Sequence, residues 1–379
     1  MMRAQLQSSI AFFSKQISDV IEEEAKSNGL RKGKLKITFV RNDLTVKHWF
    51  LTRFSISDAY KALCKEFDVL EYVTNNWLLS VHNTLRAPRF LQHSISASTS
   101  RTLKVNAQRI TREDGKIYFA CEGPNLATIC DFWTLVWQEN IKTIVSLNCP
   151  YEERLYPNSF RKNYQTIQYW PTVEGKIYGC APFKITCIKS SLMIDCKIRT
   201  NDKRECVYRL TQLRIRYGNA TYGQRDRFLT HVCYFRWPDG RLPLPWGKNN
   251  TLTKAANALL EMLVMVSSDK TLIHCRAGRG RTGVLIALDF AMYQLKSLRS
   301  VNVQALIEKI RRQRPGLVMN HLQYAYINLI IAEQAYSMGY LLDQINERFI
   351  TRQLINKVWI ALENDLKKFE ILPSIPEEE

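Results

Sequence analysis

Leu272 to Gly283 read LIHCRAGRGRTG, an apolar approach followed by a glycine-punctuated basic loop that leads into a second apolar run. The first residues predict a buried strand and the last ones open a helix, so the stretch predicts a strand, an anion-binding loop and a helix. Cys275 and Arg281 stand six positions apart. One tight loop can therefore bring a sulfur and a guanidinium group to the same anion.

The loop has the composition of an anion site. Gly278 and Gly280 allow the backbone to turn its N–H groups inward, and a helix that begins near Arg281 points its positive end at the loop. This field favours a thiolate, which predicts that Cys275 is a nucleophile at neutral pH. Arg281 offers a planar fork of donors to phosphate oxygens, and Thr282 places a hydroxyl group beside the sulfur. The alternative is a buried structural cysteine before an ordinary helix, and the common register of these residues disfavours it.

A second motif, Trp237-Pro238-Asp239, places its acid 36 residues before Cys275. The two motifs resemble the signature loop and the mobile acid loop of the cysteine-dependent protein tyrosine phosphatases, and most closely the tyrosine-specific, non-receptor type with a single catalytic domain. This resemblance implies an α+β fold: a twisted mixed central sheet flanked by helices, with the phosphate-binding loop between a strand and a helix. It also implies hydrolysis of phosphotyrosine through a phosphocysteine intermediate.

The resemblance assigns roles to the motif residues. Cys275 attacks phosphorus, Arg281 and the loop amides bind the phosphoryl oxygens, and Thr282 stabilises the thiolate as it leaves. Asp239 protonates the departing phenolate and then activates water. The expected substrate-binding residues are Arg276, Ala277, Gly278, Arg279, Gly280, Arg281, Phe90 and Gln323. The expected supporting residues are His274, Trp237 and Glu152, the last at the place of a glutamate that pairs with the signature arginine.

Three positions depart from the family pattern. Phe90 stands where the family has a tyrosine that stacks on the phosphotyrosine ring, and Gln92 stands where it has an aspartate. Met319 replaces the first of two glutamines, which positions the hydrolytic water. These departures leave open the alternative that the chain is a weakly active or inactive protein that binds phosphotyrosine. Two extra loop cations, Arg276 and Arg279, leave open the further alternative that the chain is a phosphoinositide phosphatase.

Composition limits the function classes. The chain has 379 residues, a formal net charge of +19 and ten cysteines without a C-x-x-C pair. The positive charge suits phosphotyrosine proteins as substrates and acidic or phosphoinositide ligands, whereas the scattered basic residues predict no stable nucleic-acid binding. No cofactor and no metal site are expected. No apolar run is long enough to span a membrane, and with a reactive thiol this predicts a soluble cytoplasmic protein.

Three regions are expected along the chain. Residues 1–56 predict a helical and basic extension, residues 57–335 the catalytic domain, and residues 336–379 a helical extension with a short acidic tail. Within the middle region the patterns predict a helix over 57–70, a central strand over 141–147, antiparallel strands between 183 and 234, and helices over 282–295 and 301–312.

Overall fold

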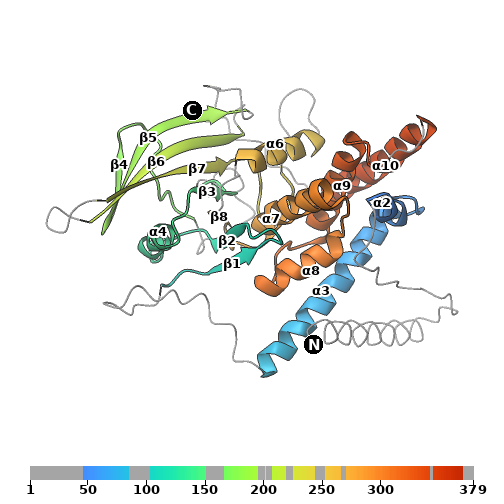
Figure 1. Cartoon of the computed structure of the whole chain (residues 1–379), viewed down its shortest axis with the longest axis horizontal. Coiled ribbons are helices and arrows are strands. Elements are labelled where there is room, and N and C mark those ends of the chain that lie inside the picture. Colours follow the sequence, from blue (N-terminus) through green and yellow to red (C-terminus); the bar gives the residue numbers. More distant parts are fainter. Residues whose placement is uncertain are drawn as a thin grey trace. The chain divides into compact units, whose positions relative to one another are not determined.

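The computed structural model describes residues 46–84, 103–150, 166–194, 201, 207–218, 225–243, 252–265, 270–341 and 345–369 (Figure 1). All of them belong to one compact unit, Thr45–Glu379. The amphipathic helix expected near the N-terminus and the acidic tail lie outside the described residues.

The described strands form one eight-stranded sheet in the order β1-β2-β8-β3-β7-β6-β5-β4. Their bounds are β1 Ala107–Thr111, β2 Ile117–Glu122, β3 Thr143–Ser146, β4 Ile177–Cys180, β5 Phe183–Met193, β6 Tyr208–Tyr217, β7 Arg225–Tyr234 and β8 Lys270–Cys275. Strands β2, β8, β3 and β7 run parallel in the centre, whereas β1 and the β4–β7 ribbon are antiparallel. This mixed sheet confirms the expected fold class, and β3 and β8 are its central strands.

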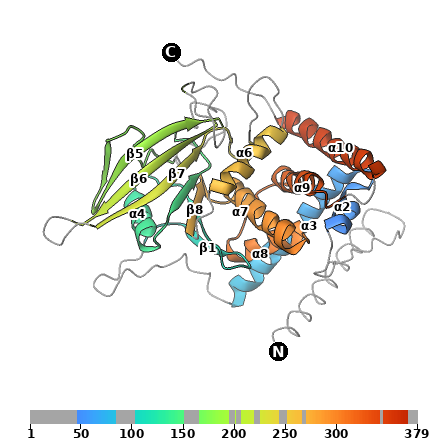
Figure 2. The ribbon, with the colours of Figure 1, turned by 45° about the horizontal axis from the view of Figure 1, so that its top comes forward.

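Two hydrophobic cores cover the two faces of the sheet, because successive strand residues point to opposite faces. Leu272 of β8 belongs to the core shared with α4 (Ile129–Gln138), and its neighbour Ile273 belongs to the core shared with most of the other helices. Phe119 and Ala120 of β2 divide in the same way. Both faces of the central strands are buried, as expected for parallel strands with helices on both sides (Figure 2).

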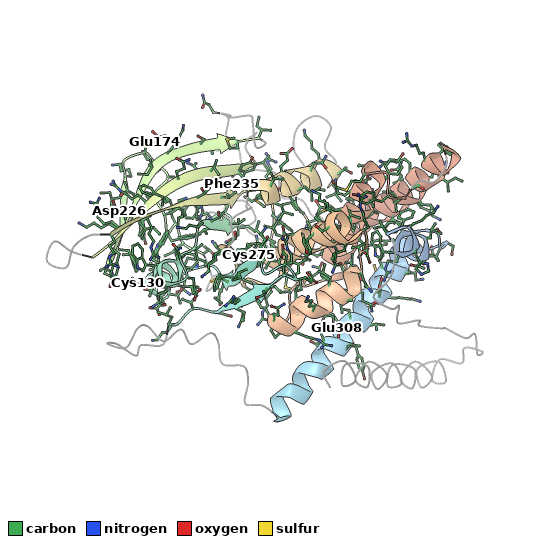
Figure 3. The ribbon with its side chains drawn as sticks, viewed as in Figure 1. Cys130, Glu174, Asp226, Phe235, Cys275 and Glu308 are labelled. Atoms are coloured by element: carbon green, nitrogen blue, oxygen red, sulfur yellow. The ribbon has the colours of Figure 1, made fainter. Side chains whose placement is uncertain are left out.

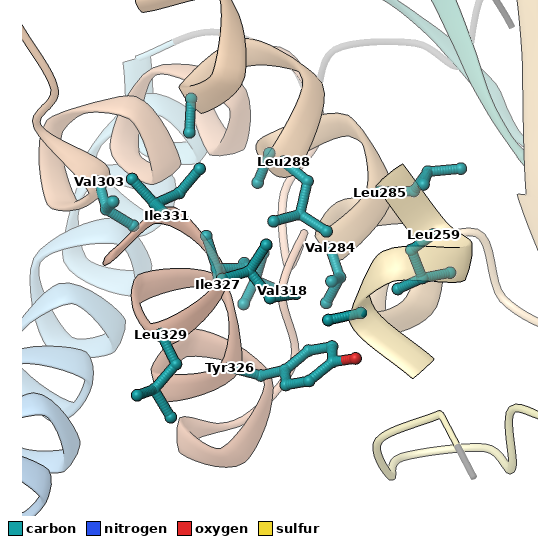
Figure 4. Packing of buried hydrophobic residues seen from close by; sticks show 14 of the residues in the cluster. Leu259, Val284, Leu285, Leu288, Val303, Val318, Tyr326, Ile327, Leu329 and Ile331 are labelled. Carbon is teal, nitrogen blue, oxygen red and sulfur yellow. The ribbon is translucent and has the colours of Figure 1, made fainter. Parts of the chain in front are cut away.

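The helices of the larger core pack around α7. Their bounds are α2 Val46–Phe54, α3 Ala59–Thr84, α6 Leu252–Met265, α7 Gly280–Tyr293 with a π-helical turn Gln294–Leu298, α8 Val303–Gln313, α9 His321–Ser337 and α10 Ile345–Phe369. Figure 4 shows Val284 and Leu288 of α7 lying against Ile327 of α9. The helix expected over 57–70 is longer than predicted, because it continues to Thr84. None of the helices in the described ranges is long and apolar enough to cross a membrane.

The C-terminal helix α10 is part of the larger core. Ile355 and Leu362 are fully buried within the same cluster as α7 and α9. The Tyr60 hydroxyl of α3 donates to Asp365 over 2.6 Å, and the indole N–H of Trp359 donates to Glu333 of α9 over 3.0 Å. We therefore propose that α10 belongs to the catalytic domain, which extends the domain beyond the C-terminal limit predicted from the sequence.

This domain assignment predicts a cooperative stability effect at α10. Ile355→Ala should lower the free energy of unfolding of the whole domain by about 2–5 kcal/mol, because it removes buried methyl groups and leaves a cavity. Ile360→Ala, at a side chain that is 58% exposed on the same helix, should change it by less than about 0.5 kcal/mol. Denaturant unfolding followed by tryptophan fluorescence measures both. If Ile355→Ala left the unfolding midpoint of the domain unchanged, α10 would not belong to the domain.

Candidate active site

The signature stretch folds as a strand, a loop and a helix, as the sequence predicts. Cys275 is the last residue of β8 and is 2% exposed, and α7 begins at Gly280. The sulfur thus lies at the carboxyl end of a central parallel strand, which is the place where open α/β sheets bind ligands. In Figure 3 Cys275 lies where the sheet meets the helices.

The backbone carbonyl groups of residues 276 to 279, which form the loop between β8 and α7, all accept hydrogen bonds from residues beyond the loop. The carbonyl of Arg276 accepts from the N–H of Gly123 over 3.0 Å, and those of Ala277 and Gly278 accept from the guanidinium of Arg314 over 3.0 and 2.6 Å. The carbonyl of Arg279 accepts from two further backbone N–H groups. A planar trans peptide directs its N–H away from its carbonyl. The amides that follow these carbonyls are therefore turned to the inner side of the loop, where an anion would bind.

Gly278 is required by the loop for two reasons. Its φ of +64° lies in the left-handed region, which side-chain-bearing residues rarely adopt. A Cβ atom at this position would also lie 2.1 Å from the carbonyl oxygen of Cys121 in β2. The loop is thus seated directly on the neighbouring strand.

Arg281 joins the phosphate loop to the acid loop. Its side chain is fully buried, one terminal nitrogen donates to the carbonyl of Trp237 over 2.7 Å, and the other donates to the carboxylate of Asp239 over 3.0 Å. The hydroxyl of Thr282 is also buried and, among the described residues, has no hydrogen-bond partner. The guanidinium, the carboxylate and the loop therefore converge on one place.

The acid loop is held by its own residues and by the start of α9. The indole N–H of Trp237 donates to the carbonyl of Arg241 over 2.8 Å, and the ring is buried against Tyr234. The amide of Asn320 donates to the carbonyl of Gly240 over 2.7 Å. In this arrangement the Asp239 side chain is 27% exposed, so the carboxylate sits at the mouth of the site.

The two extra loop arginines differ in their surroundings. A terminal nitrogen of Arg276 lies 3.5 Å from the Asp239 carboxylate, so this side chain faces the acid loop. Arg279 is exposed and passes close to Gly316 in the turn before α9. Arg279 is therefore the more exposed of the two cations.

A network of buried polar side chains lies behind Cys275. The Tyr169 hydroxyl is 2.6 Å from Nε2 of His274 and 2.7 Å from Nε2 of His231, and Nδ1 of His274 lies 3.3 Å from the Cys275 carbonyl. Nδ1 of His231 is buried without a hydrogen-bond partner among the described residues. One assignment satisfies every contact: Nε2–H of His231 donates to Tyr169, Tyr169 donates to Nε2 of His274, and Nδ1–H of His274 donates to the carbonyl.

Both histidines that bind Tyr169, His274 and His231, are neutral. Burial lowers the pKa of His274 to about 4; the nearby positive charge of Arg281 acts in the same direction, and the bond to the Cys275 carbonyl opposes it. Burial also lowers the pKa of His231 well below its ordinary value. A neutral His274 donates to the backbone carbonyl of Cys275 without adding charge beside the sulfur.

Met319, before α9, and Gln323, in the first turn of α9, differ in burial and in their contacts. Met319 is 45% exposed, and its backbone N–H donates over 2.9 Å to the side chain of Gln323, which is fully buried. The amide nitrogen of Gln323 donates to the carbonyl of Arg241 over 3.4 Å. Val318 has a φ of +61°, a strained conformation for a β-branched residue, and its carbonyl accepts from Arg311 over 2.7 Å. Gln323 thus ties this segment to the acid loop.

The structure brings Cys275, Arg281, Thr282, Asp239 and His274 together, whereas Phe90, Gln92 and Glu152 lie outside the described residues. Sequence reasoning missed Arg314, Asn320 and the pair Tyr169 and His231. Arg314 could not be found in this way, because its role depends on a contact with a loop 36 residues away in the sequence.

The fold and this loop define a phosphate-binding domain with a cysteine at the anion site, and comparison with known proteins agrees. The family model for protein-tyrosine phosphatase matches residues 90–333. The chain therefore belongs to the protein tyrosine phosphatase family.

Individual relatives are distant. Human tyrosine-protein phosphatase non-receptor type 7 is 30% identical over 239 residues, which are 60% of this chain and 55% of the relative. Mouse receptor-type tyrosine-protein phosphatase R is 27% identical over 274 residues, 70% of this chain and 36% of the relative. The chain thus spans about half the length, or less, of these curated relatives. The crystal structure of the catalytic domain of human non-receptor type 18 superposes with a TM-score of 0.54 at 21% identity, covering 74% of this chain and 99% of that one.

The neutral histidines predict acid sensitivity of the fold. An unfolded histidine takes up a proton below about pH 6.5 whereas these two do not, so unfolding binds protons and stability should fall as the pH decreases from 7 towards 4. Each histidine contributes on the order of 1.4 kcal/mol per pH unit in that window. His231→Gln should make this slope shallower, because it removes one of the two groups that take up a proton on unfolding. Urea unfolding at pH 7 and pH 5 measures the slopes, and equal slopes for the wild-type and variant proteins would contradict the assignment.

Proposed function

We propose that this domain hydrolyses phosphotyrosine in proteins through a phosphocysteine intermediate. The observation that carries the proposal is the convergence on one anion site of Cys275, the buried Arg281 and the Asp239 carboxylate that Arg281 binds over 3.0 Å. A domain that only bound phosphotyrosine would need the loop and the arginine. It would not need an acid held beside the nucleophile.

In the first step Cys275 attacks phosphorus. The inward amides of the loop and Arg281 stabilise the charge that develops on the equatorial oxygens, which is the main source of rate enhancement in such sites. Asp239 donates its proton to the phenolate oxygen of the leaving tyrosine. The buried Thr282 hydroxyl, which lacks another partner among the described residues, supports its proposed role as a donor to the cysteine sulfur.

In the second step water attacks the phosphocysteine, and Asp239 accepts a proton from that water. Both polar atoms of the Gln323 side chain bind backbone groups. We therefore propose that Gln323 positions the loops, and that the water is oriented by Asp239 with less help from the Met319 segment.

Phosphotyrosine peptides are the proposed substrate class. A structure of human non-receptor type 18 holds HER2 phosphopeptides and superposes on this chain with a TM-score of 0.56 at 21% identity. The formal net charge of +19 would favour acidic segments around the phosphotyrosine. We propose a reducing, cytoplasmic setting, because the reaction needs Cys275 as a thiolate.

The first test separates the nucleophile from the acid. Cys275→Ser should abolish turnover of a phosphotyrosine peptide while binding is retained, because the loop and Arg281 remain. Asp239→Ala should slow turnover by about 10²–10⁴-fold, since it removes general acid catalysis. Initial rates and peptide binding by calorimetry measure these effects. Wild-type turnover by Asp239→Ala, with chemistry limiting the rate, would remove Asp239 from the mechanism.

The two loop arginines should have separable effects. Arg276→Ser removes the second cation near Asp239, and we expect kcat for a small aryl phosphate to fall about fivefold, the equivalent of about 1 kcal/mol for a partly exposed pair. Arg279→Val should leave that kcat unchanged and raise KM for an acidic phosphopeptide, an effect that 0.5 M salt should reduce. Equal changes in both variants would mean that the two cations act together on substrate.

Met319 should make hydrolysis of the phosphocysteine the slow step. Rapid mixing with an aryl phosphate is expected to release a burst of phenol close to one per site, followed by slower turnover. Met319→Gln should raise the steady-state rate and reduce the burst, because it supplies an amide that can bind the water. A wild-type enzyme without a burst and a variant that is no faster would show that another group governs the water.

A further inference from the structure

Two cysteines outside the active site lie within bonding reach of each other. Cys130 is in the first turn of α4, Cys180 is the last residue of β4, and their sulfur atoms are 2.7 Å apart. A disulfide bond is about 2.05 Å long, so only a small approach would be needed to form one. The two residues are 50 positions apart in the chain, and neither has a role in the phosphatase chemistry.

The two thiols differ in access to solvent. Cys130 is exposed, and Figure 3 shows it on α4, at a distance from Cys275. Cys180 is 4% exposed, and burial together with the neighbouring Cys130 thiol raises its pKa to about 12. A soluble oxidant therefore meets Cys130 first, and Cys180 is reached only through Cys130.

We propose that Cys130 and Cys180 form a reversible redox pair that a hydroperoxide closes to a disulfide. The Cys130 thiolate attacks one oxygen of the hydroperoxide, so that an S–O bond forms and the O–O bond breaks. With hydrogen peroxide, the released hydroxide takes up a proton and leaves as water. The Cys180 sulfur then attacks the sulfenic sulfur: an S–S bond forms, the S–O bond breaks, and hydroxide leaves with the Cys180 proton as a second water. The two sulfurs together supply the two electrons that reduce the hydroperoxide.

The bond would fix one end of α4 to the sheet. The N-cap residue of α4, Thr128, makes no side-chain cap hydrogen bond to the helix, and the first turn is held by the backbone N–H of Lys104, which donates to the Asp131 carboxylate over 2.7 Å. The disulfide would add a covalent tie at this end. Phe132, two positions after Cys130 in α4, packs edge-on against His274 and Tyr169 at centroid distances of 5.8 and 5.0 Å. The disulfide therefore closes a long loop around the core that backs the nucleophile, and loop closure of this kind stabilises a fold.

The test uses the full chain with Cys275→Ser, so that oxidation of the nucleophile cannot interfere. After treatment with hydrogen peroxide, the protein is unfolded, alkylated with N-ethylmaleimide and digested. The peptides that contain Cys130 and Cys180 should appear linked, two hydrogens lighter than their sum, and dithiothreitol should separate them. Thermal unfolding of the oxidised protein should shift upward by roughly 5 °C and return on reduction.

Matched variants decide whether this pair is responsible. Adding Cys130→Ser should abolish both the link and the shift in Tm, and Cys180 should then remain a thiol that maleimide labels. Adding Cys187→Ala, which removes a buried cysteine of the adjoining strand β5, should leave both effects in place. The proposal fails if Cys130 is recovered as a sulfinic or sulfonic acid while Cys180 is fully alkylated. It also fails if the Cys130→Ser protein shows the same peroxide-dependent shift in Tm.

Discussion

The site depends on how the carbonyl groups of the phosphate loop are bound. Four successive carbonyls, from Arg276 to Arg279, accept hydrogen bonds from groups outside the loop, namely backbone N–H groups of Gly123, Gly283 and Val318 and the guanidinium of Arg314. Their geometry leaves the amides facing inward before any anion binds. A preorganised set of donors stabilises a developing charge without a cost of reorganisation at the moment of reaction.

The same loop also determines where the acid loop rests. One nitrogen of Arg281 donates to the carbonyl of Trp237 and another donates to the carboxylate of Asp239. A single buried side chain therefore binds both the backbone and the acidic side chain of this loop. Asn320 and Gln323 hold the following residues, Gly240 and Arg241, from the start of α9. Three segments distant in the sequence are thus fixed relative to one another by side chains of two helices.

The sequence predicted the parts of this site whose chemistry is local. The strand, loop and helix around Cys275 follow from apolar runs, glycines and a basic loop in one stretch, and the mixed sheet followed from the family resemblance. The side chains and the helix that hold the loop and its strand in place could not be predicted in the same way. Arg314 serves the loop through contacts across 36 or more residues, and Tyr169 joins two histidines 43 residues apart. α10 reads only as an amphipathic stripe, because what it packs against is set by tertiary structure.

Strand β8 has both faces buried in different surroundings, and this makes its register critical. His274 points to the aromatic cluster of Phe132 and Tyr169, whereas Cys275 belongs to the core on the opposite face. A shift of one residue along β2 and β3 would exchange these faces, burying an imidazole among aliphatic side chains and placing the sulfur beside Tyr169. An inserted residue within β8 would cause the same exchange of faces. The two layers that pack on the faces of β8 therefore fix the position of Cys275.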